Sequence, residues 1–245
     1  MALAEGVENS EELRTVILLG VDLIQGYYTA RPSSEIAGTI PYEIRAEIRN
    51  CRQEREDGRR LRIYTAEKNE RISLERLSRE GYSCIQIGND CNDGVITVAG
   101  SPHIDSGVHI VTAEGFTGGI TLENARLSNI TERPCIEAGG CNKLKITLVG
   151  SNRLDNSGIL VPASSELTLE GGGDLDIRLG NADYFGIGND LSSAHGKLLF
   201  RQDGTVSITA QSHGGVCIGA GLGGEISIGR GRYALTAVGS SNIGI

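Results

Sequence analysis

The sequence contains no tryptophan and only three phenylalanines among its 245 residues, whereas glycine occurs 35 times. Globular cores usually rely on aromatic side chains, so this composition favours a narrow core of Ile, Leu, Val and Ala joined by many tight corners. No apolar run approaches the length of about 18 residues that a transmembrane helix requires. We therefore predict no membrane segment.

Positive charge is also scarce, because 23 Lys and Arg residues stand against 31 Asp and Glu residues, for a formal net charge of -8. An acidic chain is repelled by phosphate backbones, and we expect no nucleic-acid partner. The N-terminus lacks a basic segment followed by an apolar one, so we predict a cytoplasmic protein without a signal peptide. The six cysteines are then expected to be reduced, partly buried thiols, since no CxxC pair or Cys/His cluster indicates zinc.

The strongest pattern in the chain is an internal repeat over residues 81–245. Apolar and polar residues alternate within each copy, and Gly, Asn and Asp mark the corners. The copies begin ITVAGSPHIDS at residue 96, ITLENARLSNI at 120, ITLVGSNRLDN at 146, LTLEGGGDLDI at 167, LLFRQDGTVSI at 198 and ISIGRGRYALT at 226. One such unit cannot bury its own apolar side, so the units must stack. We predict a mainly β fold, a right-handed parallel β-helix of about six to seven coils.

Stacking the copies as they align in sequence predicts which side chains share the core. The expected inward sets are Ile120/Leu122, Ile146/Leu148, Leu167/Leu169, Leu198/Phe200 and Ile226/Ile228. The alternation then places Thr121, Thr147, Thr168, Leu199 and Ser227 in one outward line. The last coil, ending GSSNIGI, shows no polar cap, and an uncapped end exposes strand edges. We therefore expect either a longer chain or a homodimer through this end.

Residues 37–80 differ in composition from the repeats and are predicted to form a charged helical connector. Pro41 fits the first turn of a helix that runs to about Asp57, and Gly58 ends it. Glutamates interleave with the arginines throughout this helix, which is typical of a solvated surface.

Residues 1–36 are predicted to form a strand, a helix and a second strand. Ser10 is the predicted N-cap, with acidic residues in the first helical turn, and Gly20 ends the helix. Polar residues follow both strands, which is typical of a βαβ unit whose carboxyl edge carries an active site.

This opening segment also resembles a known family in two stretches at a matching distance. The residues that carry the likeness are Ala4-Glu5-Gly6-Val7-Glu8 with Glu11, Gly20-Val21-Asp22, and Gln25-Gly26-Tyr27-Tyr28 through Arg31-Pro32. They resemble the C-terminal end of an EAL domain, a TIM-barrel phosphodiesterase that hydrolyses cyclic di-GMP with divalent metals. The resemblance covers the last two barrel strands and the helix between them.

The resemblance implies roles for three residues. Glu5 falls on the family's active-site glutamate near the metal centre, Glu8 on the next acidic position, and Gln25 on the glutamine that closes the pocket. The other metal ligands, the glutamate of the EAL signature and the active-site lysine have no counterpart in this chain. Two of eight strands cannot close a barrel, so we expect no hydrolysis by this chain alone.

The resemblance therefore implies that the chain is the C-terminal piece of a longer phosphodiesterase. That parent would supply the missing part of the EAL barrel as a partner and would bind Mg or Mn, whereas this chain is expected to need no cofactor or metal itself. The alternative is a βαβ unit that matches the family by chance.

The repeat region resembles the Gly-rich β-helix modules of bacterial surface proteins, which are often described as carbohydrate-binding. The likeness is carried by ITLVGSNRLDNSGILVPASSELTLEGGGDLDI and by FGIGND with VCIGAG. It implies a glycan or protein ligand on one face of the β-helix.

Asp174 and Asp176 are the candidate binding residues on that face. They stand two apart on a predicted strand, so both side chains point the same way. Paired carboxylates of this kind also serve in some glycoside hydrolases and lyases. The corners Gly88-Asn89-Asp90 and Gly188-Asn189-Asp190 could hold calcium, but tight turns explain these residues better.

Three functions are consistent with the sequence. The first is a non-catalytic binding or regulatory module of an EAL-type cyclic di-GMP phosphodiesterase. The second is a stand-alone carbohydrate-binding or structural β-helix, and the third is a polysaccharide lyase or glycoside hydrolase.

Overall fold

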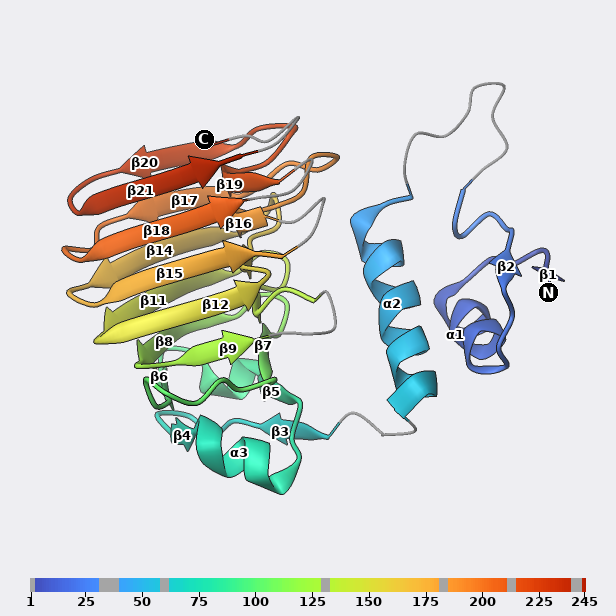
Figure 1. The fold of residues 1–245 in the computed structure, drawn as a ribbon, viewed down its shortest axis with the longest axis horizontal. Helices are drawn as coiled ribbons and strands as arrows, with labels where there is room; N and C mark the ends of the chain where they lie inside the picture. The colour runs from blue at the N-terminus through green and yellow to red at the C-terminus, as the bar shows by residue number, and fades with distance from the viewer. Residues whose placement is uncertain are drawn as a thin grey trace. The chain divides into compact units, whose positions relative to one another are not determined.

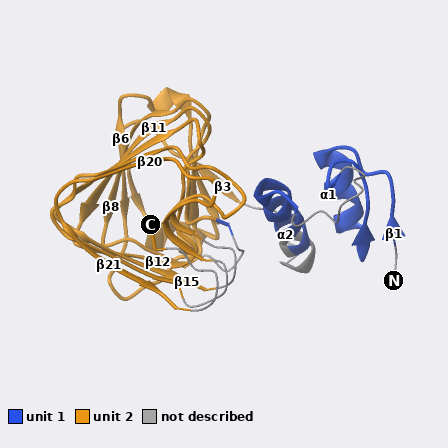
Figure 2. Cartoon of the chain, turned by 90° about the horizontal axis from the view of Figure 1, so that it is seen from above, with its two compact units in different colours: residues 1–61, 131–133 blue, residues 62–130, 134–245 orange. Residues whose placement is uncertain are grey.

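The computed structural model describes residues 3–30, 40–57, 62–128, 133–180, 185–210, 215–238 and 244–245. Arg31, Pro32, Gly58 and most of the final GSSNIGI stretch therefore lie outside the described residues. The chain divides into two compact units (Figure 2). Unit 1 comprises residues 1–61 and 131–133, and unit 2 comprises residues 62–130 and 134–245. Among the described residues, no helix is long and apolar enough to cross a membrane.

Unit 2 is a parallel β-helix of about six turns, which confirms the predicted mainly β fold (Figure 1). Three parallel sheets form its sides. The first sheet contains β3 (Ile63–Thr65), β5 (Cys84–Ile87), β7 (His109–Thr112), β10 (Ile136–Glu137), β13 (Ile159–Leu160), β16 (Phe185–Gly188) and β19 (Val216–Gly219). The second contains β4 (Arg71–Ser73), β6 (Val95–Ala99), β8 (Thr117–Glu123), β11 (Lys143–Val149), β14 (Glu166–Gly171), β17 (Lys197–Phe200) and β20 (Glu225–Ile228). The third contains β9 (Arg126–Ser128), β12 (Ser151–Asn156), β15 (Asp174–Leu179), β18 (Thr205–Ala210) and β21 (Arg232–Ala237).

The parallel stack begins before residue 81, where the sequence repeats start. β3 pairs with β5, and β4 pairs with β6. Helix α3 (Leu74–Glu80) follows β4 and ends at Gly81, whose φ of 77° suits glycine. Leu74 and Leu77 of this helix are buried in the same core cluster as the strands, so α3 closes this end of the stack (Figure 1).

The core is the predicted column of aliphatic side chains, but its register changes at one step. Ile120 pairs with Ile146, as the repeats predict, whereas Ile146 then pairs with Leu169 and not with Leu167. The predicted alignment was wrong here by two residues. The predicted outward line was wrong at the same step, because Thr147 pairs with Glu170 and not with Thr168. A shift of two keeps every side chain on its own face, so the apolar alternation tolerates either register.

A glycine explains which register is adopted at this step. Gly171 pairs with Leu148 and has a φ of 103°. A Cβ at this position would come within 2.4 Å of the Leu148 carbonyl oxygen, so only glycine fits there. From this point the stack proceeds regularly, with Leu198 on Leu167 and Phe200 on Leu169.

Unit 1 contains the predicted βαβ unit, formed by β1 (Leu3–Ala4), α1 (Ser10–Leu18) and β2 (Leu23–Ile24). The two strands are parallel, with Leu3 paired to Leu23 and Ala4 to Ile24. The N-cap of α1 is Asn9 and not Ser10, because Asn9 is extended and its Oδ1 accepts a hydrogen bond of 2.9 Å from the Glu12 amide.

The connector helix α2 (Tyr42–Asp57) belongs to the same unit as the βαβ segment. Cys51 of α2 is buried in a cluster with Val7, Leu13 and Ile17. Glu47 accepts hydrogen bonds from the Tyr28 hydroxyl, at 3.0 Å, and from the Ser10 hydroxyl. The predicted connector is therefore divided: its helix packs on α1, and its remaining strands and α3 join the β-helix.

Candidate functional site

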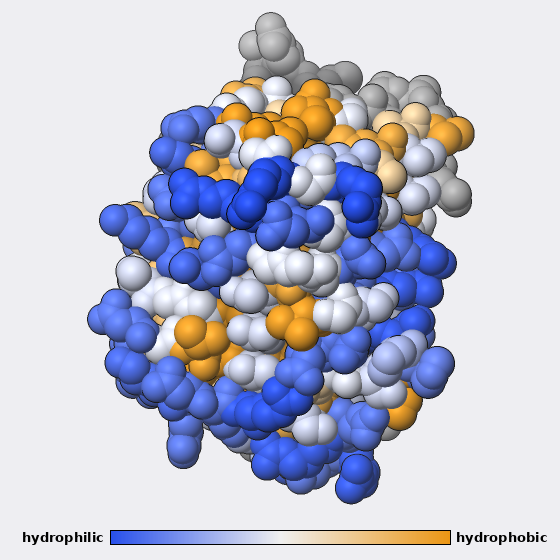
Figure 3. All heavy atoms as spheres, turned by 90° about the vertical axis from the view of Figure 1, so that its left-hand side faces the viewer, coloured by the Kyte–Doolittle hydropathy of each residue, from blue (hydrophilic) through white to orange (hydrophobic). Residues whose placement is uncertain are grey.

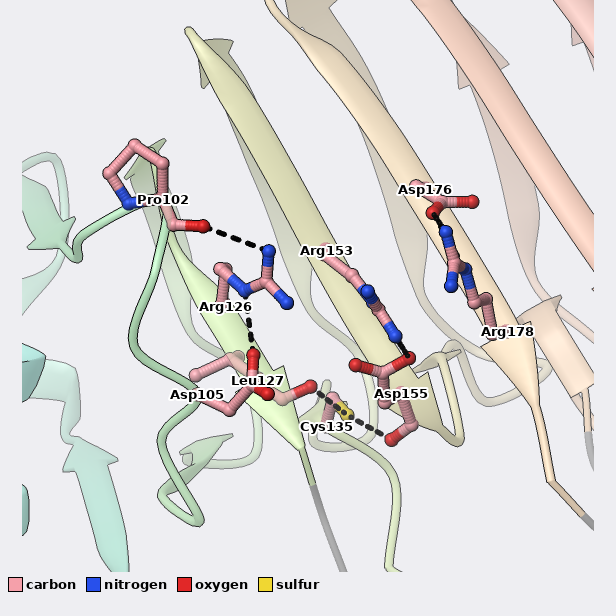
Figure 4. A network of polar contacts seen from close by, with 9 residues as sticks. All are labelled: Pro102, Asp105, Arg126, Leu127, Cys135, Arg153, Asp155, Asp176 and Arg178. Carbon is pink, nitrogen blue, oxygen red and sulfur yellow. Dashed lines mark hydrogen bonds and ion pairs between the residues drawn. The ribbon is translucent and has the colours of Figure 1, made fainter.

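The outward face of the third sheet carries charged side chains from three consecutive strands (Figure 4). Leu127, Leu154 and Ile177 point inward and are buried on β9, β12 and β15. The alternation of a strand therefore turns their neighbours to the outside. These neighbours are Arg126 on β9, Arg153 and Asp155 on β12, and Asp176 and Arg178 on β15.

Arg153, Asp155, Asp176 and Arg178 form a charge quartet. The Arg153 Nε donates to Asp155 Oδ1 at 2.8 Å, and the Arg178 Nε donates to Asp176 Oδ2 at 2.9 Å. The order of the charges is reversed between the two strands, so Arg153 pairs with Asp176 and Asp155 pairs with Arg178. Charges of opposite sign are thus neighbours both along each strand and across the strands, which favours this pairing.

The two halves of the quartet differ in burial. The side chains of Asp155 and Arg153 are 14% and 27% exposed, whereas those of Asp176 and Arg178 are 35% and 55% exposed. The hydrogen bond to Asp155 raises the pKa of Arg153 above its ordinary value, against the opposing effect of desolvation. The β12 pair is therefore the more buried half of the quartet, and the β15 pair is the more exposed half.

Arg126 extends this charged surface toward the loop before β7. Its Nε donates to Asp105 Oδ1 at 2.6 Å, and its Nη1 donates to the Pro102 carbonyl at 2.9 Å (Figure 4). Beneath the surface the buried thiol of Cys135 points to the carbonyl oxygens of Leu127 and Asp155. Five of the six cysteines are buried, and Cys141 is exposed.

Asp174 and Asp176 project from the same strand, as the sequence predicts, but each has its own protein partner. Asp174 Oδ1 accepts a hydrogen bond of 2.7 Å from the Thr205 amide at the start of the next strand, β18. Asp176 is bound to Arg178. The first carboxylate links two coils, and only the second belongs to the charge quartet.

Glu5 and Gln25 lie at the same edge of the small parallel pair in unit 1. They directly follow the paired residues Ala4 and Ile24, and both are exposed. The Gln25 amide donates to the Ala4 carbonyl at 2.8 Å. Glu8 lies instead before α1, where its amide donates to the Glu12 carboxylate at 2.8 Å.

The residues described in unit 1 do not fit the divalent metal that the EAL resemblance implies. Glu5 and Gln25 offer one carboxylate and one amide, whereas Mg and Mn prefer several oxygen ligands. Across the described parts of the chain, no three His, Cys, Asp or Glu side chains come together as a metal site.

The two Gly-Asn-Asp corners form turns. In the first corner the Cys91 amide donates a hydrogen bond of 3.1 Å to the Gly88 carbonyl oxygen. The Asn89 Nδ2 donates a hydrogen bond of 3.0 Å to the Glu114 carbonyl oxygen. In the second corner Asp190 is buried, and its Oδ1 accepts hydrogen bonds from the amide and the hydroxyl of Ser192. The contacts of Asp190 are typical of an Asx turn, whereas the first corner is a 3₁₀ turn over Asn89–Cys91.

The sequence patterns did not single out Arg126, Arg153, Asp155 and Arg178, although one signal was present. An Arg-x-Asp triplet at 153–155 is followed by an Asp-x-Arg triplet at 176–178. The complementary order becomes visible only when the two triplets are placed in register. Comparison of the chain with protein-family models, curated proteins and solved structures gives no match in any of the three.

Proposed function

We propose that this chain is a non-catalytic binding and regulatory module of an EAL-type cyclic di-GMP phosphodiesterase. Its ligand-facing surface is the outward face of the third sheet. Residues 1–36 are the C-terminal end of the catalytic barrel, and the missing barrel portion is the partner of this chain in the parent protein.

The observation that carries this proposal is the parallel pairing of β1 and β2. A barrel site requires its residues at the carboxyl ends of neighbouring parallel strands. Glu5 and Gln25 occupy such positions, one residue beyond the paired Ala4 and Ile24.

The packing of α2 supports the regulatory part of the proposal. Glu47 of α2 contacts Tyr28, which follows β2, and Ser10, which begins α1. A displacement of α2 would therefore move Tyr28, which lies three residues after Gln25.

The charge quartet supports binding at the third sheet. Asp176 and Arg178 offer an acceptor and a donor to a polar ligand, on a strand held in place by the more buried Arg153 and Asp155. Outward Ser207 and Thr209 on β18 adjoin Asp176 and Arg178 in the same rows and add hydroxyl groups. This arrangement also suits the second candidate, a stand-alone carbohydrate-binding β-helix.

A polysaccharide lyase or hydrolase is less well supported by the same face. Catalysis would need Asp174 and Asp176 as an acid and a base that reach substrate. Asp174 instead accepts from the Thr205 amide, and Asp176 is bound to Arg178.

The proposal is tested with the protein purified at its native length, assayed for cyclic di-GMP hydrolysis with Mg or Mn and for binding on a glycan array. The test variant is Asp176→Asn with Arg178→Gln. Its matched control is Glu170→Gln with Lys145→Gln, because that ion pair on the second sheet has the same exposure, 55% and 35%.

We expect hydrolysis by the native protein, and a change in its regulation or in ligand binding only in the third-sheet variant. Hydrolysis that is absent from the native protein contradicts the phosphodiesterase assignment. Glycan binding without hydrolysis, lost in the third-sheet variant alone, favours the stand-alone module.

A further inference from the structure

The outward face of the third sheet is polar throughout its central strands. On β9, β12, β15 and β18 every outward residue is Arg, Asp, Ser or Thr. In the view of Figure 3, hydrophobic side chains gather mainly at the other end of the molecule's surface, around the last coil of the stack. A partner of the third sheet would therefore be recognised by charge and hydrogen bonding, because there is no apolar patch on these strands for it to cover.

Two outward rows run across the strands of this face, and their charges alternate. One row contains Arg153 and Asp176, and the other contains Asp155 and Arg178. On each strand the two charges are opposite and lie about 6.6 Å apart along the strand. Exchanging the two rows therefore turns the pattern into its own complement, with every positive position becoming negative and every negative one positive.

A two-fold axis performs this exchange when it runs along the stack between the two rows. Two copies of the sheet then meet face to face, and each strand lies over the same strand of the copy, in the opposite direction. On β15, Asp176 faces Arg178 of the copy, and on β12, Arg153 faces Asp155 of the copy. A two-fold contact of this kind closes on itself and stops at the dimer.

The charges select this position of the axis over its neighbours. An axis centred on the row of Arg153 would place this side chain against Arg153 of the copy. An axis one row toward the start of the strands would place Asp174 against Asp176 of the copy. Both alternatives bring like charges together, which is unfavourable across an interface.

The second sheet does not have this self-complementary order. On β11 the exposed residues two apart are Lys143 and Lys145, which carry the same charge. The same two-fold operation would therefore place lysine against lysine. Self-recognition by charge is thus a property of the third sheet and not of the β-helix in general.

The ion pair on β15 leaves an acceptor for a second guanidinium. Both the Nε and the Nη2 of Arg178 lie 2.9 Å from the same oxygen of Asp176, Oδ2. A carboxylate accepts through two oxygens, so Oδ1 can accept from Arg178 of the copy. The side chains are 35% and 55% exposed, so a partner can reach both.

The neighbouring strand allows the two faces to approach. The outward residues that follow Asp176 and Arg178 in their rows are Ser207 and Thr209 on β18. In the two-fold arrangement Ser207 faces Thr209 of the copy, which brings two short hydroxyl side chains together. Neither is large enough to hold the charged pairs of β15 apart.

We propose that the outward face of the third sheet binds a second copy of this chain, with Asp176 of each copy paired to Arg178 of the other. This dimer goes beyond the proposed binding function and does not depend on it. A ligand on the same face would compete with the copy. The interface is small and polar, so association is weak and is screened by salt.

The test is sedimentation equilibrium of the 245-residue protein at low salt with two charge-reversal variants. Asp176→Lys makes both charges of β15 positive, and Arg178→Glu makes both negative. Each variant then faces its own copy with like charges, and we expect its self-association to weaken by at least about tenfold. Mixing the two variants restores opposite charges across the axis, so the mixture should associate about as strongly as the parent.

Recovery in the mixture separates the loss of an interface from a loss of folding, because unfolded variants would not recover. The matched controls are Glu170→Lys and Lys145→Glu, since this ion pair on the second sheet has the same exposures of 35% and 55%. Both controls should associate like the parent, and added salt should weaken the association of parent and controls alike.

Three results would overturn the proposal. The first is a parent protein that stays monomeric at low salt and millimolar concentration. The second is undiminished self-association of Asp176→Lys or Arg178→Glu. The third is a mixture of the two variants that remains monomeric although both retain the circular dichroism and melting of the parent. None of these results bears on ligand binding or hydrolysis, which are measured separately.

Discussion

Arg153 on β12 lies opposite Asp176 on β15, and each is also bound to an opposite charge two residues along its own strand. The second sheet repeats this principle, since Lys143 pairs with Glu166, Glu166 with Lys197, and Lys197 with Glu225. Alternating charges along the stacking axis distinguish one register from its neighbours, whereas the aliphatic core does not. The outer faces of the β-helix thus contribute to the alignment of its coils.

The two halves of the charge quartet should contribute unequally to stability. Asp155→Asn removes the negative charge bound to the more buried Arg153, and we expect a loss of about 1–3 kcal/mol in the free energy of unfolding. Asp176→Asn breaks a more exposed pair and should cost at most about 1 kcal/mol. Urea denaturation at neutral pH measures the free energy of unfolding of both variants. Equal losses would contradict the stronger contribution that we expect from the more buried β12 pair.

Close contact between coils should make one glycine irreplaceable. A Cβ on Gly158 would lie 1.7 Å from the Gly186 carbonyl oxygen of the next coil. Gly158→Ala should therefore destabilise the protein by about 1–3 kcal/mol or more, through forced separation of the coils. Gly172→Ala is the control, since no atom lies within 4 Å of its added Cβ, and its melting temperature should stay close to that of the parent.

Removal of the cap should weaken the first coils. Leu77 of α3 is fully buried in the core, and Leu77→Ala is expected to cost about 2–5 kcal/mol. Arg79→Ala, on the exposed side of the same helix, should change stability little. Chemical denaturation and light scattering at equal concentrations compare the two variants with the parent protein. An unchanged stability of Leu77→Ala would contradict the role of α3 as a cap.

Unit 1 should lose stability in alkaline solution through Tyr28. Burial, and next its hydrogen bond to Glu47, raise the pKa of this hydroxyl above its ordinary value. A raised folded-state pKa means that the neutral phenol is favoured by folding, so its contribution is complete below the unfolded pKa of about 10. The contribution is lost as pH rises through the folded pKa. Tyr28→Phe should flatten the high-pH part of a helix-ellipticity titration, and an unchanged slope would contradict this role.

The β-helix could be predicted because its signal is repeated in every coil. Alternating apolar residues and Gly-rich corners recur between residue 96 and residue 237, and the structure stacks them in parallel. The register at Ile146 could not be predicted, because it depends on the space above Leu148 that Gly171 leaves free. The start of the stack at β3 and β4 could not be predicted either. Each of these strands has only three residues, and Ile63 is half exposed, so the apolar alternation is too short to recognise.

The candidate site could be predicted only in part. Asp174 and Asp176 were placed on a common strand by alternation alone, but their partners lie on other coils or depend on register. The Arg153 pairing to Asp176 joins residues of neighbouring coils, and such contacts follow from stacking and not from local sequence.

The size of the protein in its native cells distinguishes a module of a larger phosphodiesterase from a stand-alone β-helix. An antibody against unit 2 is used for an immunoblot, and the immunoprecipitate is assayed for cyclic di-GMP hydrolysis. We predict a species far larger than 25.9 kDa, with hydrolysis of cyclic di-GMP in the precipitate. A single species at 25.9 kDa without hydrolysis would contradict it and leave the β-helix as a stand-alone binding protein.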